Sequence, residues 1–341
     1  MSRGPASVTS HDIAREVGVS QSTVSRALRG DPRVDPATAA RVLRVAELRG
    51  YMPNASARSL VTRRTRTIAV VVADIKNPFY PELVEALHEA LGRSGYRMVL
   101  VNERTDTRGQ SGLAELYRDG GADGAVFVSV TIEQRVAELL TTSPVPSVLL
   151  NRDVAGADVD RVMADNPGGA AQVADLLYGL GHRRIGFISG PENTSTSRDR
   201  EAGLSKALAQ RGVPLSPELR RVGEFTHHSG YQWATELLDR PDRPTAIFCA
   251  NDVVAFGALD AARNLRIEVP RAVSIVGFDD IPMASWGAFA LTTVRQPLTD
   301  MARDAARILI ERVEGNAELE RQRLVFPTHL VQRSTTGPPP S

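Results

Sequence analysis

The chain has 341 residues, of which 42% are hydrophobic, 24% charged and 5% aromatic, so it is long enough for two or three globular domains. No apolar run approaches the roughly 18–20 residues of a membrane-spanning helix, and residues 1–10 lack the apolar segment of a signal peptide. The single cysteine, Cys249, excludes an intramolecular disulfide and a cysteine-based metal site. We therefore expect a cytoplasmic protein without a metal or cofactor.

The net charge of +1 hides an uneven distribution along the chain. Residues 1–66 contain 12 arginines and five acidic residues, whereas residues 67–341 contain 29 basic and 35 acidic residues. A basic segment joined to a slightly acidic one indicates a polyanionic partner, although a solvated basic face would give the same count. The motifs within the basic segment decide between the two.

Two short helices are predicted near the N-terminus. Thr9 and Asp12 have capping-box spacing at the start of the first helix, and Gly18 provides the left-handed position that ends it. Ser20 then caps a second helix over 21–28. Two short helices joined by a glycine turn are the helix-turn-helix arrangement.

The second helix presents side chains suited to reading DNA on the face opposite Val24 and Leu28. These side chains are Gln21, Ser22, Ser25 and Arg26. A third helix is predicted from Pro36 to about Arg49. The residues expected to cover the first two helices from it are Val42, Leu43, Ala46 and Leu48.

From Thr67 onward, short apolar runs alternate with amphipathic helices. Strands are predicted at 68–73, 98–101, 125–128, 148–150, 185–188, 246–249 and 273–278. Runs that are apolar on both faces and separated by helices predict parallel, doubly wound sheets of the α/β class. About 275 residues are long for one such sheet, so we expect two lobes.

Several predicted strands end in a polar residue, namely Asp74, Asn151, Asn251 and Asp279. Ligands bind at the carboxyl ends of strands in open α/β sheets, so these residues predict a polar cleft. Each of them taken alone is more often a helix N-cap than a ligand-binding residue.

At this point the sequence resembles a known family. The motifs are Val8–Thr9, Asp12–Ala14, Gly18–Ser20, Ser22–Leu28, Gly50–Tyr51, Pro53–Asn54, Ala57–Leu60, Asn77–Tyr80, Leu180–Ile185, Gly190–Pro191, Arg200 with Gly203, Asn251–Asp252 with Gly257–Ala258, Gly277–Asp280 and Leu291–Val294. Together they resemble the lactose-repressor (LacI) family of bacterial transcription regulators over nearly the whole chain. The resemblance implies a ligand-responsive regulator, usually a repressor, that binds a pseudo-palindromic operator as a homodimer.

The resemblance also implies a domain plan. A helix-turn-helix domain spans 1–52, and a hinge helix with its linker spans 53–66. From the residues alone, the segment 53–66 is equally compatible with a plain basic linker. Two lobes similar to periplasmic sugar-binding proteins follow, one from 67–165 and 298–325, the other from 166–297 and 326–336. Three crossings join them near 165–166, 295–297 and 324–327. Residues 337–341 are expected to be a disordered tail without an apolar heptad, which favours a dimer over a tetramer.

The residues that the resemblance assigns to DNA binding are Thr9, Ser20, Gln21, Ser22, Ser25, Arg26, Asn54, Ala57 and Leu60. Gln21 and Ser22 match the positions that choose the operator sequence. Residues 54–60 correspond to a hinge helix in the minor groove, where Leu60 matches the leucine that wedges between base pairs.

The residues that it assigns to the effector are Phe79, Tyr80, Asn151, Arg152, Arg200, Phe225, Asn251, Asp279 and Gln296. The aromatic residues form flat walls, and the polar ones bind hydroxyl or carboxylate groups of a sugar-like ligand, with a purine also allowed. Asn151 departs from the aspartate of many relatives, and an amide binds hydroxyls without pairing with a cation.

Two other classes of protein remain as alternatives. A periplasmic solute-binding protein shares the two-lobed core but needs a signal peptide, and here a basic helix-turn-helix stands in its place. An enzyme on a doubly wound fold is allowed in principle, yet the chain lacks a phosphate-binding loop, a zinc-protease helix and a nucleophile elbow. The six histidines are scattered along the chain.

Leu60→Ala is expected to weaken operator binding and to leave weak binding to random DNA nearly unchanged. The reason is that the leucine acts through the DNA kink and contacts no phosphate. Gel shifts on operator and random duplexes measure both affinities. Equal losses on the two DNAs would contradict the assignment.

Overall fold

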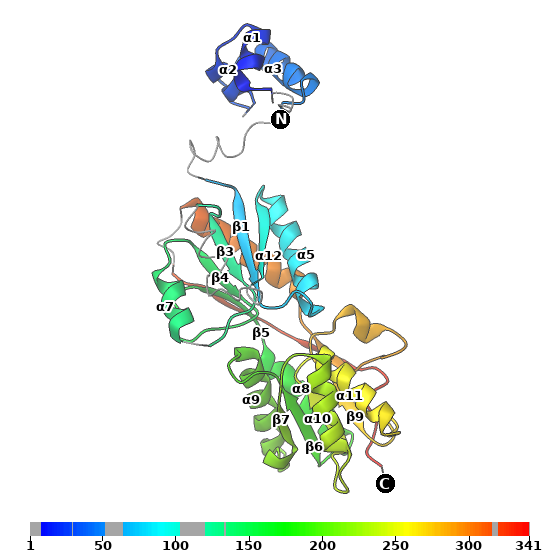
Figure 1. The fold of residues 1–341 in the computed structure, drawn as a ribbon. Helices are drawn as coiled ribbons and strands as arrows, with labels where there is room; N and C mark the ends of the chain where they lie inside the picture. Colours follow the sequence, from blue (N-terminus) through cyan, green and yellow to red (C-terminus); the bar gives the residue numbers. More distant parts are fainter. Residues whose placement is uncertain are drawn as a thin grey trace, which may run out of the picture. The chain divides into compact units, whose positions relative to one another are not determined.

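The computed structural model describes residues 8–28, 30–51, 64–102, 120–132, 134–315 and 320–340. The chain divides into two compact units, residues 1–65 and residues 66–341 (Figure 1). Among the described helices, none combines the length and hydropathy that crossing a membrane requires.

The first unit is a three-helix domain made of α1 (Ser10–Val17), α2 (Gln21–Ala27) and α3 (Pro36–Leu48). Its core contains Ile13, Val24 and Val42, all fully buried. The prediction that Leu43 and Leu48 cover the first two helices is wrong, because these side chains are 51% and 78% exposed. Val42 and Ala46 are one helical turn apart and fill the contact, which turns their neighbours toward solvent.

The second unit contains two parallel sheets (Figure 1). The first sheet has the order β11-β5-β4-β3-β1-β2. In chain order its strands are β1 (Thr67–Val72), β2 (Arg97–Asn102), β3 (Gly124–Phe127), β4 (Ser147–Leu150), β5 (Asp160–Ala164) and β11 (Arg323–Phe326). The helices around this sheet are α5 (Phe79–Arg93), α7 (Gln134–Thr142) and α12 (Leu298–Glu314).

The second sheet has the order β7-β6-β8-β9. Its strands are β6 (Ile185–Ser189), β7 (Arg220–Val222), β8 (Ala246–Cys249) and β9 (Ser274–Val276). The helices of this lobe are α8 (Asn166–Gly179), α9 (Ser195–Gln210), α10 (His227–Leu238) and α11 (Asp252–Asn264). Antiparallel strands β10 (Thr293–Arg295) and β12 (His329–Val331) lie beside it.

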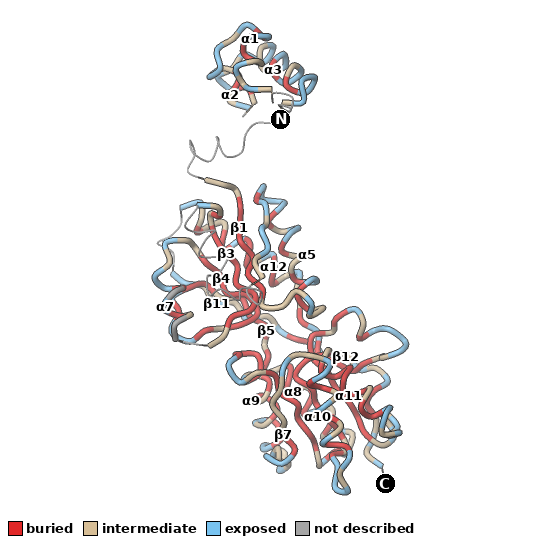
Figure 2. The backbone as a smooth tube through the Cα atoms, viewed as in Figure 1, coloured by how far each residue is buried: buried red, intermediate tan, exposed pale blue. Residues whose placement is uncertain are grey.

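The central strands of both sheets are buried on both faces, whereas the edge strands β2, β7 and β11 are partly exposed (Figure 2). In β1, Ile68, Val70 and Val72 face the core under α5 and α12. The alternate residues Ala69 and Val71 belong to a separate core on the side of α7. Successive side chains of a strand point to opposite faces, so a strand buried on both sides must be apolar throughout.

The chain passes from one lobe to the other after β5, after β10 and after β11. Two of these crossings are hydrogen-bonded to each other, because Asp165 N–H donates to the Phe326 carbonyl at 2.8 Å. The Thr328 hydroxyl also donates to the Asp165 carbonyl at 3.1 Å. Phe326 pairs with Ala164 in the first sheet and so belongs to the first lobe, one residue beyond our expected boundary.

The expected disordered tail is wrong for Gly337. Its carbonyl accepts a hydrogen bond from the buried ring of His182 at 2.9 Å, and its N–H donates to the Ser274 hydroxyl at 3.0 Å. Prolines forbid a helix here, but they do not prevent extended chain from packing against β9. Burial lowers the pKa of His182, so the ring is neutral at pH 7.

Asp160→Asn is expected to lower the free energy of unfolding by about 3–5 kcal/mol. Asp160 and Arg312 are 0% and 3% exposed and pair at 2.9 Å, joining β5 to α12, so the variant removes the carboxylate from a buried ion pair. The exposed pair Arg303–Asp300 on α12, at 2.8 Å, provides a matched control. Asp300→Asn should cost under about 1 kcal/mol. If urea unfolding showed equal losses of unfolding free energy for the two variants, the buried pair would not have the stabilising role assigned to it.

Candidate DNA-reading surface and ligand pocket

The helix-turn-helix is fixed by local hydrogen bonds. The Thr9 hydroxyl accepts from Asp12 N–H, and the Asp12 carboxylate accepts from Thr9 N–H at 2.9 Å, so the predicted capping box is present. Gly18 has φ +74°, the left-handed conformation that glycine adopts without strain. The Ser20 hydroxyl accepts from Thr23 N–H at 3.1 Å and begins α2. Thr9 and Ser20 therefore have capping roles in the protein itself.

The exposed side of α2 carries the expected polar side chains. Gln21, Ser22 and Arg26 are exposed, and Ser25 is half-buried. Arg26 forms no ion pair with any residue that the structure describes. Gln21 donates to the Ser10 hydroxyl at 3.2 Å. Such groups are available to base edges and phosphates. The remaining expected DNA contacts, Asn54, Ala57 and Leu60, lie outside the described residues.

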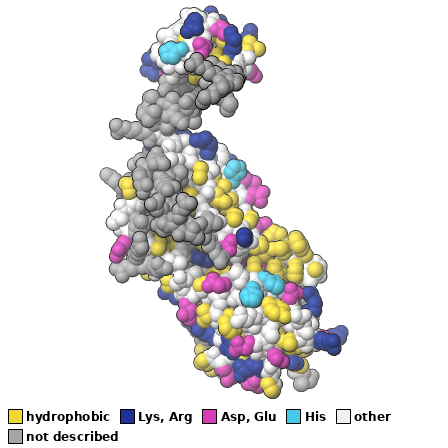
Figure 3. Space-filling view, in the orientation of Figure 1, with side chains coloured by type: hydrophobic (Ala, Val, Ile, Leu, Met, Phe, Trp, Pro, Cys, Tyr) yellow, Lys and Arg dark blue, Asp and Glu magenta, His cyan; other side chains and the backbone are white. Residues whose placement is uncertain are grey.

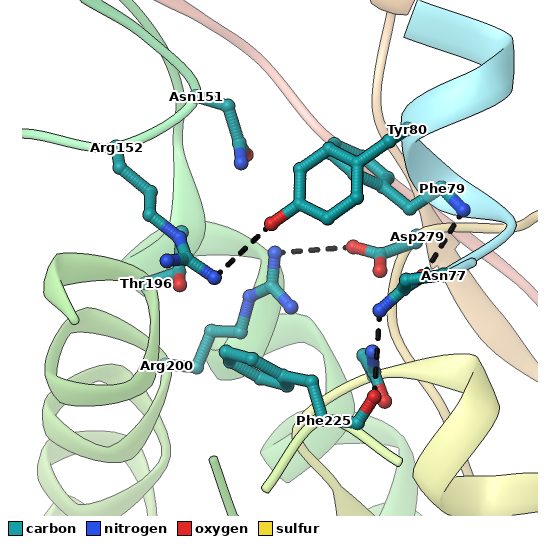
Figure 4. A pocket seen from close by; sticks show the side chains of 10 residues that line it. Asn77, Phe79, Tyr80, Asn151, Arg152, Thr196, Arg200, Phe225 and Asp279 are labelled. Carbon is teal, nitrogen blue, oxygen red and sulfur yellow. Dashed lines mark hydrogen bonds and ion pairs between the residues drawn. The ribbon is translucent and has the colours of Figure 1, made fainter. Parts of the chain in front are cut away.

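A pocket lies where strands of both lobes end (Figure 4). It encloses about 270 Å³, open solvent at its mouth included. Its lining residues are Asn77, Phe79, Tyr80, Asn151, Arg152, Thr196, Arg200, Phe225, Asn251 and Asp279. The structure therefore brings together every expected effector residue except Gln296, which reaches the pocket through Asp279.

The polar lining residues stand at the ends of strands and the starts of helices. Asn151 follows β4 with φ +75°, and Asp279 lies beyond β9 with φ +116°. Positive φ is uncommon outside glycine and gathers at functional sites. Asn251 caps α11, because its side-chain oxygen accepts from Val254 N–H at 2.9 Å. Capping fixes this residue at the pocket and leaves its amide N–H groups for another acceptor.

Aromatic rings form opposite walls of the pocket. Phe79 and Tyr80 begin α5 and meet edge to face with centroids 5.5 Å apart. Phe225 comes from the other lobe and packs against Gly190, where a Cβ atom would lie 2.3 Å from its ring. Gly190 is therefore required for the ring to enter the pocket.

The two lobes also touch directly. Asn77 donates to the Phe225 carbonyl at 3.4 Å. Asp153 N–H donates to the Ser195 hydroxyl at 2.8 Å, and Ile132 N–H donates to the Asn193 carbonyl at 2.9 Å. These few hydrogen bonds close the lobes around the pocket.

Arg200 is the most connected residue of the site. Its Nε donates to Asn166 at the start of α8 at 2.8 Å, and its Nη1 donates to the Ala250 carbonyl after β8. Its Nη2 pairs with Asp279 at 3.1 Å, and the guanidinium stacks on the Phe278 ring at 3.7 Å. Arg200 is 3% exposed and stays charged, because an arginine is not deprotonated in a protein.

Asp279 links this arginine to a crossing between the lobes, since Gln296 Nε2 donates to its Oδ1 at 2.7 Å. Burial raises the pKa of Asp279 to about 6, although Arg200 and Gln296 both favour the carboxylate. Burial also raises the pKa of neighbouring Asp252 well above its ordinary value. Asp252 accepts from Ile281 N–H at 2.9 Å and from the Thr293 hydroxyl, which holds the loop after β9.

Three buried polar atoms around the pocket have no hydrogen-bond partner among the described residues. They are Asn151 Oδ1, Arg152 Nε and Gln296 Oε1. Buried polar atoms in native proteins are nearly always bonded, so their orphaned state requires an explanation. A polar ligand in the pocket would satisfy those of Asn151 and Arg152, which line it.

Sequence reasoning missed two lining residues and misplaced one. Asn77 accepts from Phe79 N–H at 3.1 Å, and Thr196 lies in the first turn of α9, so both are set by helix starts. Asp74 was expected in the cleft but does not line it, because its carboxylate accepts from Lys76 N–H at 3.0 Å in the turn. Within the described residues, no cluster of His, Cys, Asp or Glu could hold a metal ion.

Between pH 4 and 6, the second unit should become less stable as the pH rises. Asp279 has a raised folded-state pKa of about 6 against an ordinary 3.8, so the folded state binds more protons in this range. The stability lost through this group is about 2–3 kcal/mol. Urea unfolding at several pH values, with Asp279→Asn as the reference, measures it. Identical pH profiles for the two proteins would contradict the assignment.

Comparison with known proteins adds to these observations. Residues 9–54 match the family described as "Bacterial regulatory proteins, lacI family", and residues 174–336 match the "Periplasmic binding protein-like domain". The HTH-type transcriptional regulator DegA of Bacillus subtilis (strain 168) is 34% identical over 97% of this chain and 98% of its own.

Solved structures are similar to this chain over almost its full length. A transcriptional regulator CelR–cellobiose complex is 34% identical with TM-score 0.71, covering 96% of this chain and 99% of the other. The lac repressor dimer bound to operator and the anti-inducer ONPF is 26% identical with TM-score 0.85, covering 97% and 99%. The chain belongs to the LacI family of DNA-binding bacterial transcription regulators, a non-enzymatic family in which a helix-turn-helix precedes a periplasmic-binding-protein-like domain.

Proposed function

We propose that this protein is a repressor that binds a pseudo-palindromic operator as a homodimer and changes its operator affinity when a small sugar-like effector binds. The observation that carries the proposal is the set of three orphaned buried polar atoms around a pocket walled by both lobes. A site built in this way is completed by a ligand.

The lining supports a carbohydrate. Phe79, Tyr80 and Phe225 offer flat apolar walls, while Asn151, Asn251 and Asp279 offer amide and carboxylate groups that pair with hydroxyls. A similar regulator, CelR, has been solved as a complex with cellobiose. The ligand pocket of this chain fits the same chemical class.

The switch follows from the placement of the pocket. A ligand that contacts Tyr80 of the first lobe and Arg200 of the second favours the closed arrangement over an open one. Only its differential affinity for the two arrangements shifts the population, and such couplings are about 1–3 kcal/mol, or 5–150-fold in affinity. That range is enough to release or recruit a DNA-binding protein.

Exposed apolar side chains support a homodimer. Val99 and Leu100 are each 39% exposed on β2, the edge strand of the first sheet. Trp286 is 53% exposed in the second lobe, where Figure 3 shows hydrophobic side chains gathered over the segment that follows β9. Apolar side chains on an unpaired edge indicate a partner surface. A similar protein, the lac repressor, has been solved as a dimer on its operator.

Selection of binding sites from random DNA should recover an inverted repeat with a deformable centre. Gln21→Ala should change the preferred base at one position in each half-site, at about 1–3 kcal/mol per lost base contact. Glu47→Gln, on the exposed face of α3, is the control and should select the wild-type sequence. Failure to enrich any repeat, or identical selection by the Gln21 variant, would contradict the proposal.

A further inference from the structure

We propose that the effector carries a carboxylate or phosphate group, and that Arg152 binds this group together with the N-terminus of α9. This inference rests on the proposed function, because it assumes that the pocket holds the effector. It narrows the ligand from carbohydrates in general to anionic ones, such as sugar acids and sugar phosphates.

Arg152 is a buried cation that forms no ion pair with any described residue. Its side chain belongs to a residue only 8% exposed, and no carboxylate forms an ion pair with it in the part of the chain that the structure describes. Its Nη2 donates to the Tyr80 hydroxyl at 3.3 Å, its Nε has no partner, and its guanidinium lies 5.6 Å from the centre of the Phe225 ring. A buried charge is costly unless it is paired.

Asp153, which follows Arg152 in the chain, and Asp279, which lines the pocket, are both already paired. Asp153 pairs with Arg161 at 2.7 Å. Asp279 pairs with Arg200 at 3.1 Å and also accepts from Gln296. The pocket lining therefore contains two guanidinium groups and one carboxylate, which leaves one positive charge for a ligand to balance.

The start of α9 also favours an anionic ligand. This 16-residue helix has Thr194 at its N-cap, but no side chain caps its first N–H groups. The Thr194 hydroxyl instead donates to the Pro191 carbonyl at 2.9 Å and bonds with the Ser197 hydroxyl at 2.8 Å. Thr196, in the first turn, lines the same pocket as Arg152 (Figure 4).

An arginine beside an uncapped helix N-terminus is a recurring way to bind an anion. The free N–H groups and the helix dipole favour negative charge, and the guanidinium adds charge-assisted hydrogen bonds to two oxygens. The other side of the pocket carries Asn251 and Asp279, which suit hydroxyl groups. A polyhydroxylated ligand with one acidic end matches both halves of the pocket.

Inorganic phosphate is the first probe. The full-length protein is melted with increasing phosphate at an ionic strength held constant with sodium chloride. Wild type should show a saturable rise in melting temperature, and Arg152→Gln should need at least about tenfold more phosphate for the same rise. Arg152→Lys keeps the charge and should retain part of the effect. Arg93→Gln, which removes an exposed arginine of α5, should behave as wild type.

A matched set of sugars then tests the ligand class. Glucuronate and glucose 6-phosphate should stabilise wild type more than glucose at equal concentration, and the difference should disappear in Arg152→Gln. Equal stabilisation by all three sugars in both proteins would overturn the inference while leaving the sugar-responsive function intact. Stabilisation by phosphate without any by the anionic sugars would overturn the carbohydrate assignment.

The stability of Arg152→Gln without any ligand is a measurement that does not depend on the choice of sugar. If Arg152 is an unpaired buried charge, Arg152→Gln should be at least as stable as wild type in chloride buffer. A large loss of stability would mean that the guanidinium is already satisfied by the protein, and would overturn the inference. Failure of the proposed function appears elsewhere, as failure to select an operator, which does not involve Arg152.

Discussion

The buried guanidinium of Arg200 ties together the parts of the second lobe that form the ligand pocket. It bonds to the start of α8, to the carbonyl after β8 and to Asp279 beyond β9. Three strand or helix ends that are far apart in sequence are thereby held at one place. The same network continues through Gln296 into a crossing between the lobes, so the pocket and this crossing share one set of hydrogen bonds. Networks of this kind in a low-dielectric interior are strong when complete and costly when broken.

This arrangement explains how a ligand could act at a distance. The two lobes are joined by three crossings, of which two are bonded to each other through Asp165 and Thr328. Only a few direct hydrogen bonds, such as Asn77 to Phe225, hold the lobes closed. A ligand that bonds to the orphaned atoms of Asn151 and Arg152, which line the pocket, would favour the closed arrangement.

Much of the fold was predictable because its signals are local. Capping residues, the left-handed Gly18 and strands apolar on both faces indicated the helix-turn-helix and most strands of both sheets. The pattern did not predict β7 and β11, which are short and carry arginines and are strands because they pair with a neighbouring strand. Leu43 was misassigned because propensity does not tell which of two adjacent apolar residues faces a partner.

The site was less predictable than the fold. The positions of the strand ends predicted Asn151, Asn251 and Asp279 at the pocket. They also predicted Asp74 there, but its carboxylate bonds to Lys76 N–H within a turn, which is visible only in the structure. The unpaired charge of Arg152 is likewise invisible in sequence, because it depends on where Asp153 finds its partner. The sequence names the groups that can bind a ligand, and the packing decides which of them are left unsatisfied.

The most direct test of the central claim is to measure the operator affinity of the wild type and of Asp279→Ala. Each affinity is measured with and without a carbohydrate that raises the melting temperature of the wild type. The account predicts that this ligand changes wild-type affinity by at least about fivefold. The Asp279→Ala protein should bind operator within about twofold of wild type and should not respond, because Arg200 and Gln296 have lost their shared partner. An equal response in both proteins, or a ligand that stabilises the protein without changing operator affinity, would contradict the account.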